Sequence, residues 1–182
     1  MIATWVRRAL LTAAVLPLVP TLAGCSVPPA GFTGVSVTAD GKPLIVALAC
    51  HDGIDQVLLY PDPEAADPDA EAADPDAEAA VEPEYTDVWN AAEPVGGFTS
   101  FPLTDPAGGN GWTPDETPRA LKPEQLYEVY GATTDNSWMT LHHSFTLADL
   151  KELTPDQVAY TDDDKVRTTT VADFRAHACD GF

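Results

Sequence analysis

The sequence predicts an all-β domain, an antiparallel sandwich with two short peripheral helices. Short apolar runs recur along the chain between clusters of Pro, Gly, Asn and Asp, which is typical of strands joined by turns. Helix-capping signals stand only at the start of residues 147–153 and 171–179. We therefore expect a single domain over residues 34–182, which is long enough to bury a core.

Residues 1–24 have the composition of a cleaved export signal. Arg7 and Arg8 precede an apolar stretch, 9–22, that two prolines interrupt. This stretch is too short to span the roughly 30 Å of bilayer hydrocarbon as a stable helix. A basic segment, an apolar segment and then small residues indicate a signal peptide. The arginine pair leaves both the general secretory route and the twin-arginine route open.

A cysteine directly follows this segment. Leu22-Ala23-Gly24-Cys25 resembles the bacterial lipobox at all four positions. The resemblance implies that Cys25 takes a diacylglyceryl group and is the first residue after cleavage. It predicts a lipoprotein that Cys25 holds in the cell membrane, on the extracytoplasmic face. Pro28, Pro29, Gly31 and the adjoining Gly34 argue against regular structure here, so we expect residues 25–33 to be a flexible leash.

The charge of the chain is strongly one-sided. Without Arg7 and Arg8, seven of the nine basic residues remain against all 29 acidic ones, a formal net charge of −22. A surface this negative repels nucleic acid and anionic lipid headgroups. We therefore expect no nucleic-acid function.

Three strands are expected at the start of the domain. Residues 34–39 alternate between apolar and polar side chains, and residues 44–50 are almost continuously apolar. The Asp40-Gly41 pair between them favours a tight β-hairpin turn. A third strand is expected over residues 56–60.

Residues 61–84 form an acidic insert. The heptapeptide at 67–73 is repeated unchanged at 74–80, and the insert carries ten acidic residues and no basic one. Such a composition cannot bury enough apolar surface to offset the entropy of ordering the chain. We expect a disordered loop that projects from the domain.

Beyond the insert, apolar runs bounded by turn residues predict five more strands. These cover residues 85–89, 97–103, 126–133, 137–145 and 166–171.

The two helices are expected from their caps. Thr146 is followed at the third helical position by Asp149, and Thr170 by Asp173, the spacing at which a threonine caps a helix N-terminus.

Residues 121–129 carry a local resemblance. Their Leu, Pro, Tyr and Val spacing resembles the tyrosine corner of fibronectin type III domains, in which the hydroxyl bonds back to the backbone before a core strand. The resemblance implies that the sandwich is immunoglobulin-like and that Tyr127 has a structural role. It implies nothing about activity.

Cys50 and Cys179 are the two cysteines left after Cys25. In an exported chain we expect them to form a disulfide with each other. The alternative is a copper or zinc site in which His51 and His177 join them. Adjacent strand residues, and helical residues two apart, point in different directions, so this geometry favours the disulfide and no metal.

Two tryptophans and a histidine are candidate binding residues. Trp112 follows the glycine-rich stretch 108–111 and either presents its ring at a hairpin tip or folds back onto the core. His142 is expected to share a strand face with Trp138, which would form the wall of a polar site. His143 is expected on the opposite, buried face of the same strand.

No catalytic residue is nominated. The chain contains no Gly-x-Ser-x-Gly, Ser-x-x-Lys or His-Glu-x-x-His motif and no glycine-rich phosphate loop. Residues 131–138 and Ala178-Cys179-Asp180 resemble uncharacterised small lipoproteins of high-GC Gram-positive bacteria, a resemblance that implies location and no chemistry. We expect a monomeric, non-enzymatic binding module without a cofactor, which contacts an envelope protein or a wall polymer. The alternatives are a metal-handling lipoprotein and an enzyme with an unrecognised site.

Overall fold

The computed structural model describes residues 27–61, 87–180 and 182. The expected signal segment 1–24, Cys25 and the acidic repeat lie outside the described residues. The described part is built from strands and two short helices, so the prediction of an all-β domain is confirmed. The strands are β1 (Pro29–Val37), β2 (Pro43–Pro61), β3 (Asp87–Pro102), β4 (Trp112–Pro114), β5 (Tyr127–Ala132), β6 (Met139–Leu141), β7 (His143–Phe145), β8 (Gln157–Asp162) and β9 (Lys165–Thr170).

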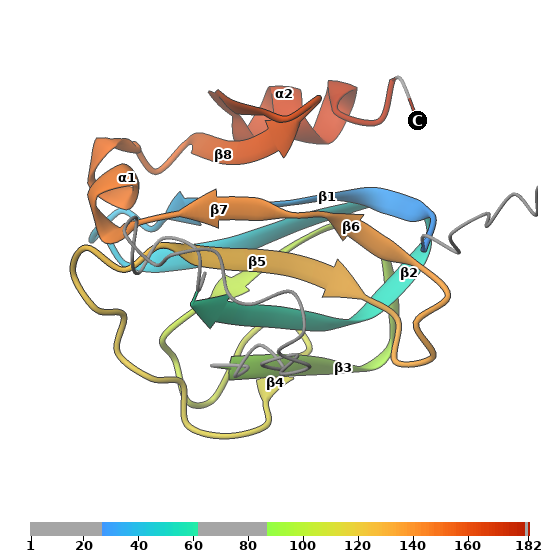
Figure 1. Cartoon of the computed structure of the whole chain (residues 1–182), viewed down its shortest axis with the longest axis horizontal. Helices are drawn as coiled ribbons and strands as arrows, with labels where there is room; N and C mark the ends of the chain where they lie inside the picture. Colours follow the sequence, from blue (N-terminus) through green and yellow to red (C-terminus); the bar gives the residue numbers. More distant parts are fainter. Residues whose placement is uncertain (1–26, 62–86, 181) are drawn as a thin grey trace, which may run out of the picture.

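Four of these strands close into a small barrel (Figure 1). β2 pairs with β1 and β5, and β6 completes the ring by pairing with β5 on one side and β1 on the other. The β1–β6 pair is parallel, and the other pairs in the ring are antiparallel. This pairing differs from the expected immunoglobulin-like sandwich, because all the described strands belong to one continuous sheet that curls on itself.

β2 and β3 are longer than we predicted. The expected strands 44–50 and 56–60 are both parts of β2, and 97–103 continues the strand that begins at Asp87. The β2–β3 register shifts between Ala49 and Ile54, so both strands bend there without ending. Such bulges let a long strand follow the curvature of a barrel.

The hairpin between β1 and β2 is confirmed. Val37 pairs with Pro43, and the Gly41 N–H donates to the Thr38 carbonyl at 2.9 Å. Gly41 has a φ of +76°, in the region that glycine adopts without steric cost.

The leash expected over residues 25–33 is wrong for its second half, because β1 already begins at Pro29. The glycines there serve close packing. A Cβ on Gly31 would stand 2.0 Å from the Leu48 carbonyl oxygen, and one on Gly34 would stand 2.3 Å from the Ala159 carbonyl oxygen. The two glycines therefore let β2 and β8 lie against β1.

β2 separates two apolar clusters. Ile45 and Ala47 point into the barrel, whereas Val46 and Leu48 point to the other side. The second cluster lies under helix α2 (Val171–His177) and is closed by Phe174, which is 1% exposed. Figure 1 shows α2 and β8 as a layer beside β1. The second cluster contains Phe32, Val46, Leu48, Val158, Tyr160 and Phe174.

Both helices start where their caps predict. In α1 (Leu147–Glu152), the Thr146 hydroxyl accepts from the Asp149 N–H, and the Asp149 carboxylate accepts from the Thr146 N–H. In α2, the Thr170 hydroxyl accepts from the Asp173 N–H at 3.0 Å. These bonds satisfy backbone donors that have no partner within the helix.

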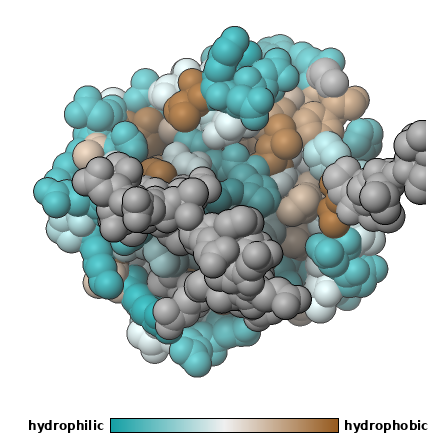
Figure 2. All heavy atoms as spheres, in the orientation of Figure 1, coloured by the Kyte–Doolittle hydropathy of each residue, from teal (hydrophilic) through white to brown (hydrophobic). Residues whose placement is uncertain are grey.

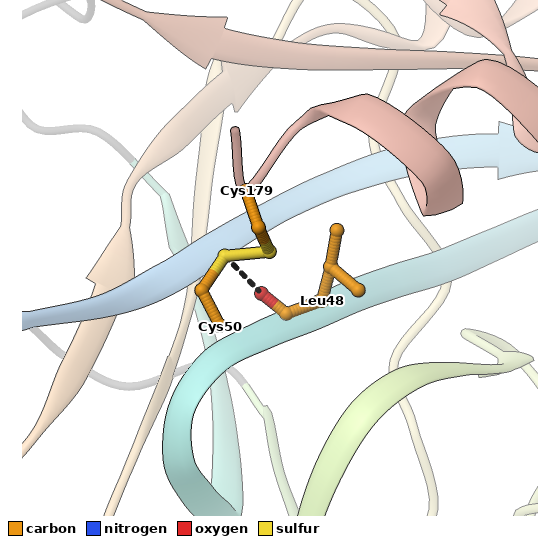
Figure 3. Close-up of a disulfide and its surroundings, with 3 residues drawn as sticks. All are labelled: Leu48, Cys50 and Cys179. Atoms are coloured by element: carbon orange, nitrogen blue, oxygen red, sulfur yellow. Dashed lines mark hydrogen bonds between the residues drawn. A yellow bond between two sulfur atoms is a disulfide. The ribbon is translucent and has the colours of Figure 1, made fainter. Parts of the chain in front are cut away.

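The expected disulfide is present (Figure 3). Cys50 lies at the bend of β2, and Cys179 lies just beyond α2, with 2.03 Å between the two Sγ atoms. Both cysteines pack against the second cluster, beside Leu48. The bond therefore fastens the layer formed by β8, β9 and α2 to the barrel.

The Tyr127 side chain makes the contact that we expected for it. Its hydroxyl accepts a hydrogen bond from the Lys122 N–H at 2.7 Å, and its ring is 4% exposed. It thereby fixes the chain that enters β5.

Candidate functional site

Trp112 is not an exposed binding residue. Its side chain is 1% exposed, it stacks on Phe101 with the ring centroids 5.0 Å apart, and its indole N–H donates to the Thr99 hydroxyl at 3.0 Å. Of the two alternatives for the glycine-rich hairpin, the structure shows the one in which the ring folds back onto the core. An aromatic side chain that satisfies its polar atom inside the core is stable there.

The expectation that Trp138 and His142 share one strand face is also wrong. β5 pairs Ala132 with Met139 and Val129 with His143. Three steps along β5 thus match four steps along the partner, so His142 is an extra residue between β6 and β7. Such a bulge reverses the alternation of faces.

The bulge accounts for the positions of the neighbouring side chains. Thr140 and His143 are both buried although they are three positions apart, which a regular strand would place on opposite faces. The Thr140 hydroxyl contacts the Thr33 hydroxyl at 2.6 Å and accepts from the Gly131 N–H at 2.7 Å. His142 is left on the outer side, stacked on Tyr130 with centroids 4.3 Å apart and bonded to Glu128.

Trp138 lies in an open hollow of about 600 Å³ at one end of the barrel. The bend of β2 and the turn between β5 and β6 supply its walls. Besides Trp138, hydroxyl and carboxylate side chains dominate the lining. The lining residues are Asp52, Gly53, Asp55, Pro94, Thr133, Thr134, Asp135, Ser137 and Trp138.

Hydrogen bonds hold the polar side of this hollow in place. The Asp55 carboxylate accepts from the Thr134 N–H at 2.7 Å and from the Thr134 hydroxyl at 2.9 Å, which ties β2 to the turn. The Ser137 hydroxyl donates to the Asp135 carboxylate at 2.6 Å. Bonds from Ser137 and Thr133 hold the pKa of Asp135 below its ordinary value, so this carboxylate is ionised at neutral pH.

An aromatic group borders the hollow. The ring of His51 lies 6.5 Å from that of Trp138 and 6.1 Å from that of Phe182, centroid to centroid. Phe182 is 38% exposed. The view in Figure 2 shows a surface that is mainly hydrophilic, with small apolar patches between polar residues. The lining of the hollow thus combines the aromatic ring of Trp138 with many hydrogen-bonding groups, and the ring of His51 lies next to Trp138.

His142 lines a different hollow, of about 510 Å³, near the entry of the chain into β1. Val27, Pro29 and Thr161 are among its neighbours there. The structure therefore separates two candidate residues that the strand pattern placed together. Asp52, Asp55 and Asp135 do line the same hollow as Trp138. The sequence does not single them out as site residues, because the pairing of β2 with β5 is what brings them close to Trp138.

The structure does not bring together the residues of the alternative metal site. Cys50 and Cys179 bond to each other, and His177 contacts Asp180 at 3.1 Å. Across residues 27–61 and 87–180, no group of three His, Cys, Asp or Glu side chains lies close enough to hold a metal ion.

Within the described part of the chain, no helix is both long enough and apolar enough to cross a membrane. Comparisons with protein-family models, curated proteins and solved structures found no match to this chain.

Proposed function

We propose that the protein is a lipid-anchored binding module on the extracytoplasmic face of the cell membrane, which holds a polymer of the cell wall through the hollow around Trp138. The observation that carries this proposal is the lining of the hollow. An exposed part of an aromatic ring stacks on the apolar face of a sugar, and nearby hydroxyl and carboxylate groups accept hydrogen bonds from the sugar hydroxyls.

The charge of the hollow narrows the class of polymer. Asp52, Asp55 and Asp135 line it, and no Lys or Arg does among the residues that the structure describes. An anionic polymer would be repelled, because these carboxylates lie on a protein that is already strongly acidic. We therefore propose a neutral or amino-bearing polysaccharide as the ligand and assign no catalytic step to the hollow. An envelope protein is the competing partner.

Trp138→Ala tests this site. We expect the variant to bind insoluble cell-wall polysaccharide at least about 10-fold more weakly than the wild-type protein, since truncating a central aromatic contact commonly costs 1–2 kcal/mol or more. Cosedimentation with purified wall polysaccharide measures the change. His142→Ala is the matched control, because His142 lines the separate hollow. Equal binding by Trp138→Ala and the wild type would contradict the proposal.

Cys25→Ser tests the anchor. We expect the variant to be released into the medium with the same far-UV circular dichroism and unfolding midpoint as the wild-type domain. The reason is that the described residues have their own core, which begins at Ala30. Fractionation of cells and medium measures the release. A variant that stays with the membrane, or that is released misfolded, would speak against a role of the lipid as an anchor alone.

A further inference from the structure

The barrel wall has an opening between β7 and β8. β1 pairs with β6 as far as Phe32 and then with β8 at Gly34 and Val35. In the described part of the chain, β7 pairs with β5 and has no second partner. β1 thus changes its pairing partner from β6 to β8 at this point, and His143 on β7 contacts Thr161 on β8.

His143 is buried there with one polar atom unused. Its side chain is 1% exposed, and its Nδ1 lies 3.1 Å from the Thr161 hydroxyl on β8. Nε2 has no hydrogen-bond partner among the described residues. A buried polar atom without a partner commonly costs 1–3 kcal/mol, so an apolar residue would make a more stable wall.

The same side chain borders a cavity of about 390 Å³. One face of the β8–β9 hairpin forms one side of the cavity through Gln157, Ala159 and Thr168, and α1 forms the other through Asp149 and Glu152. The Thr161 hydroxyl, which contacts Nδ1, lines the hollow around His142 and does not line this cavity. Nδ1 is the ring nitrogen that contacts Thr161, so Nε2 is the ring nitrogen left for a ligand, and His143 is among the residues that line the cavity.

The lining defines the chemistry of a ligand. Asp149 and Glu152 contribute two carboxylates, and no Lys or Arg is among the lining residues in the described chain. Burial lowers the pKa of the His143 imidazole to about 4, against the opposing charge of Asp149. The ring is therefore neutral at pH 7 and offers a hydrogen bond without a competing positive charge.

We propose that this cavity binds a primary alkylammonium group, with the carboxylates of Asp149 and Glu152 facing the charge and His143 Nε2 accepting one N–H. In this arrangement Nδ1–H of His143 donates to the Thr161 hydroxyl, which fixes the tautomer with a free Nε2 lone pair. The aliphatic part of the ligand packs on Leu153, Ala159 and Val166. The site is separate from the hollow around Trp138 and does not depend on its function.

The experiment uses the full chain with ¹⁵N-labelled histidine and n-butylammonium as the probe. We expect a saturable shift of the His143 Nε2 resonance at probe concentrations up to about 50 mM, since a fragment of this size binds in the millimolar range or tighter. The isosteric alcohol n-butanol is the neutral control and should cause no such shift. Equal shifts with both probes, or none with n-butylammonium, would overturn the proposal.

Two variants locate the site. Glu152→Gln removes one charge from an exposed position and should weaken n-butylammonium binding several-fold while the fold is unchanged. His143→Leu should abolish binding, followed through the backbone amide resonances of α1, and should raise the unfolding midpoint because it removes the unpartnered atom. His142→Ala is the matched control and should bind as the wild type does. Unchanged binding by both Glu152→Gln and His143→Leu would exclude this cavity.

Discussion

Replacing Cys50 and Cys179 together by alanine lowers the free energy of unfolding by about 3–5 kcal/mol, with the upper value given by the chain-entropy model for a closed loop of this size. The two cysteines are 129 residues apart in sequence, so the bond removes much of the conformational freedom of the unfolded chain. This loss would consume a large fraction of the stability typical of a domain.

Urea unfolding followed by circular dichroism measures the effect. Every protein in the series carries Cys25→Ser, so that no other thiol is present. The wild-type protein with its disulfide reduced should have the same free energy of unfolding as the double variant, because both lack the cross-link. A loss below about 1 kcal/mol would mean that the unfolded chain is already restricted without the bond.

The second large effect is a loss of stability in mild acid. The His143 pKa is about 4 in the folded protein against an ordinary value of 6.5. Between these values the unfolded chain binds a proton that the folded chain does not, so stability falls as pH decreases from about 6.5 to 4 and levels off below. A shift of this size corresponds to about 3 kcal/mol.

His143→Leu isolates this contribution. The variant should exceed the wild type in stability most at pH 4 and below, and this difference should shrink as the pH rises to 6.5 and stay constant above it. Chemical denaturation at half-unit pH steps measures the difference. Burial raises the pKa of carboxylates such as Asp87. These groups titrate in both proteins, so their contributions cancel in the difference between the two stabilities. A constant difference across this range would show that His143 is not the titrating group.

Local features of the fold were predictable from the sequence because they depend on neighbouring residues. The turn at Asp40-Gly41 and the caps at Thr146 and Thr170 occur where their signals stand. The disulfide was predictable because two cysteines were left after Cys25. Predicting the turn and the caps requires only a few adjacent residues, and predicting the disulfide requires only the number of cysteines.

Strand pairing was not predictable in the same way. The parallel contact of β1 with β6 and the transfer of β1 to β8 depend on residues more than 100 positions apart. From the sequence alone, Gly31 and Gly34 indicate flexibility, because glycine is common in loops. In the folded chain they are the residues that allow close contact between backbones.

The candidate site shows the same limit. A strict alternation over 137–145 placed Trp138 beside His142, and one extra residue at the bulge separated them. The partners that Trp138 does have come from the bend of β2 and from its own turn. Asp55 reaches Thr134 across 79 positions of sequence, and no spacing in the chain indicates that contact.

On the proposal that Cys25 carries a lipid, the start of β1 at Pro29 limits how the domain lies at the membrane. With Cys25 lipidated, the four residues 25–28 reach at most about 14 Å. The Pro28 carbonyl accepts from the Met139 N–H, directly beside Trp138, and Figure 1 shows the chain entering at the same end of the barrel as the turn between β5 and β6. On the proposed lipid anchor, the hollow then faces the lipid headgroups, while α1 and the turn between β1 and β2 lie at the opposite end of the barrel.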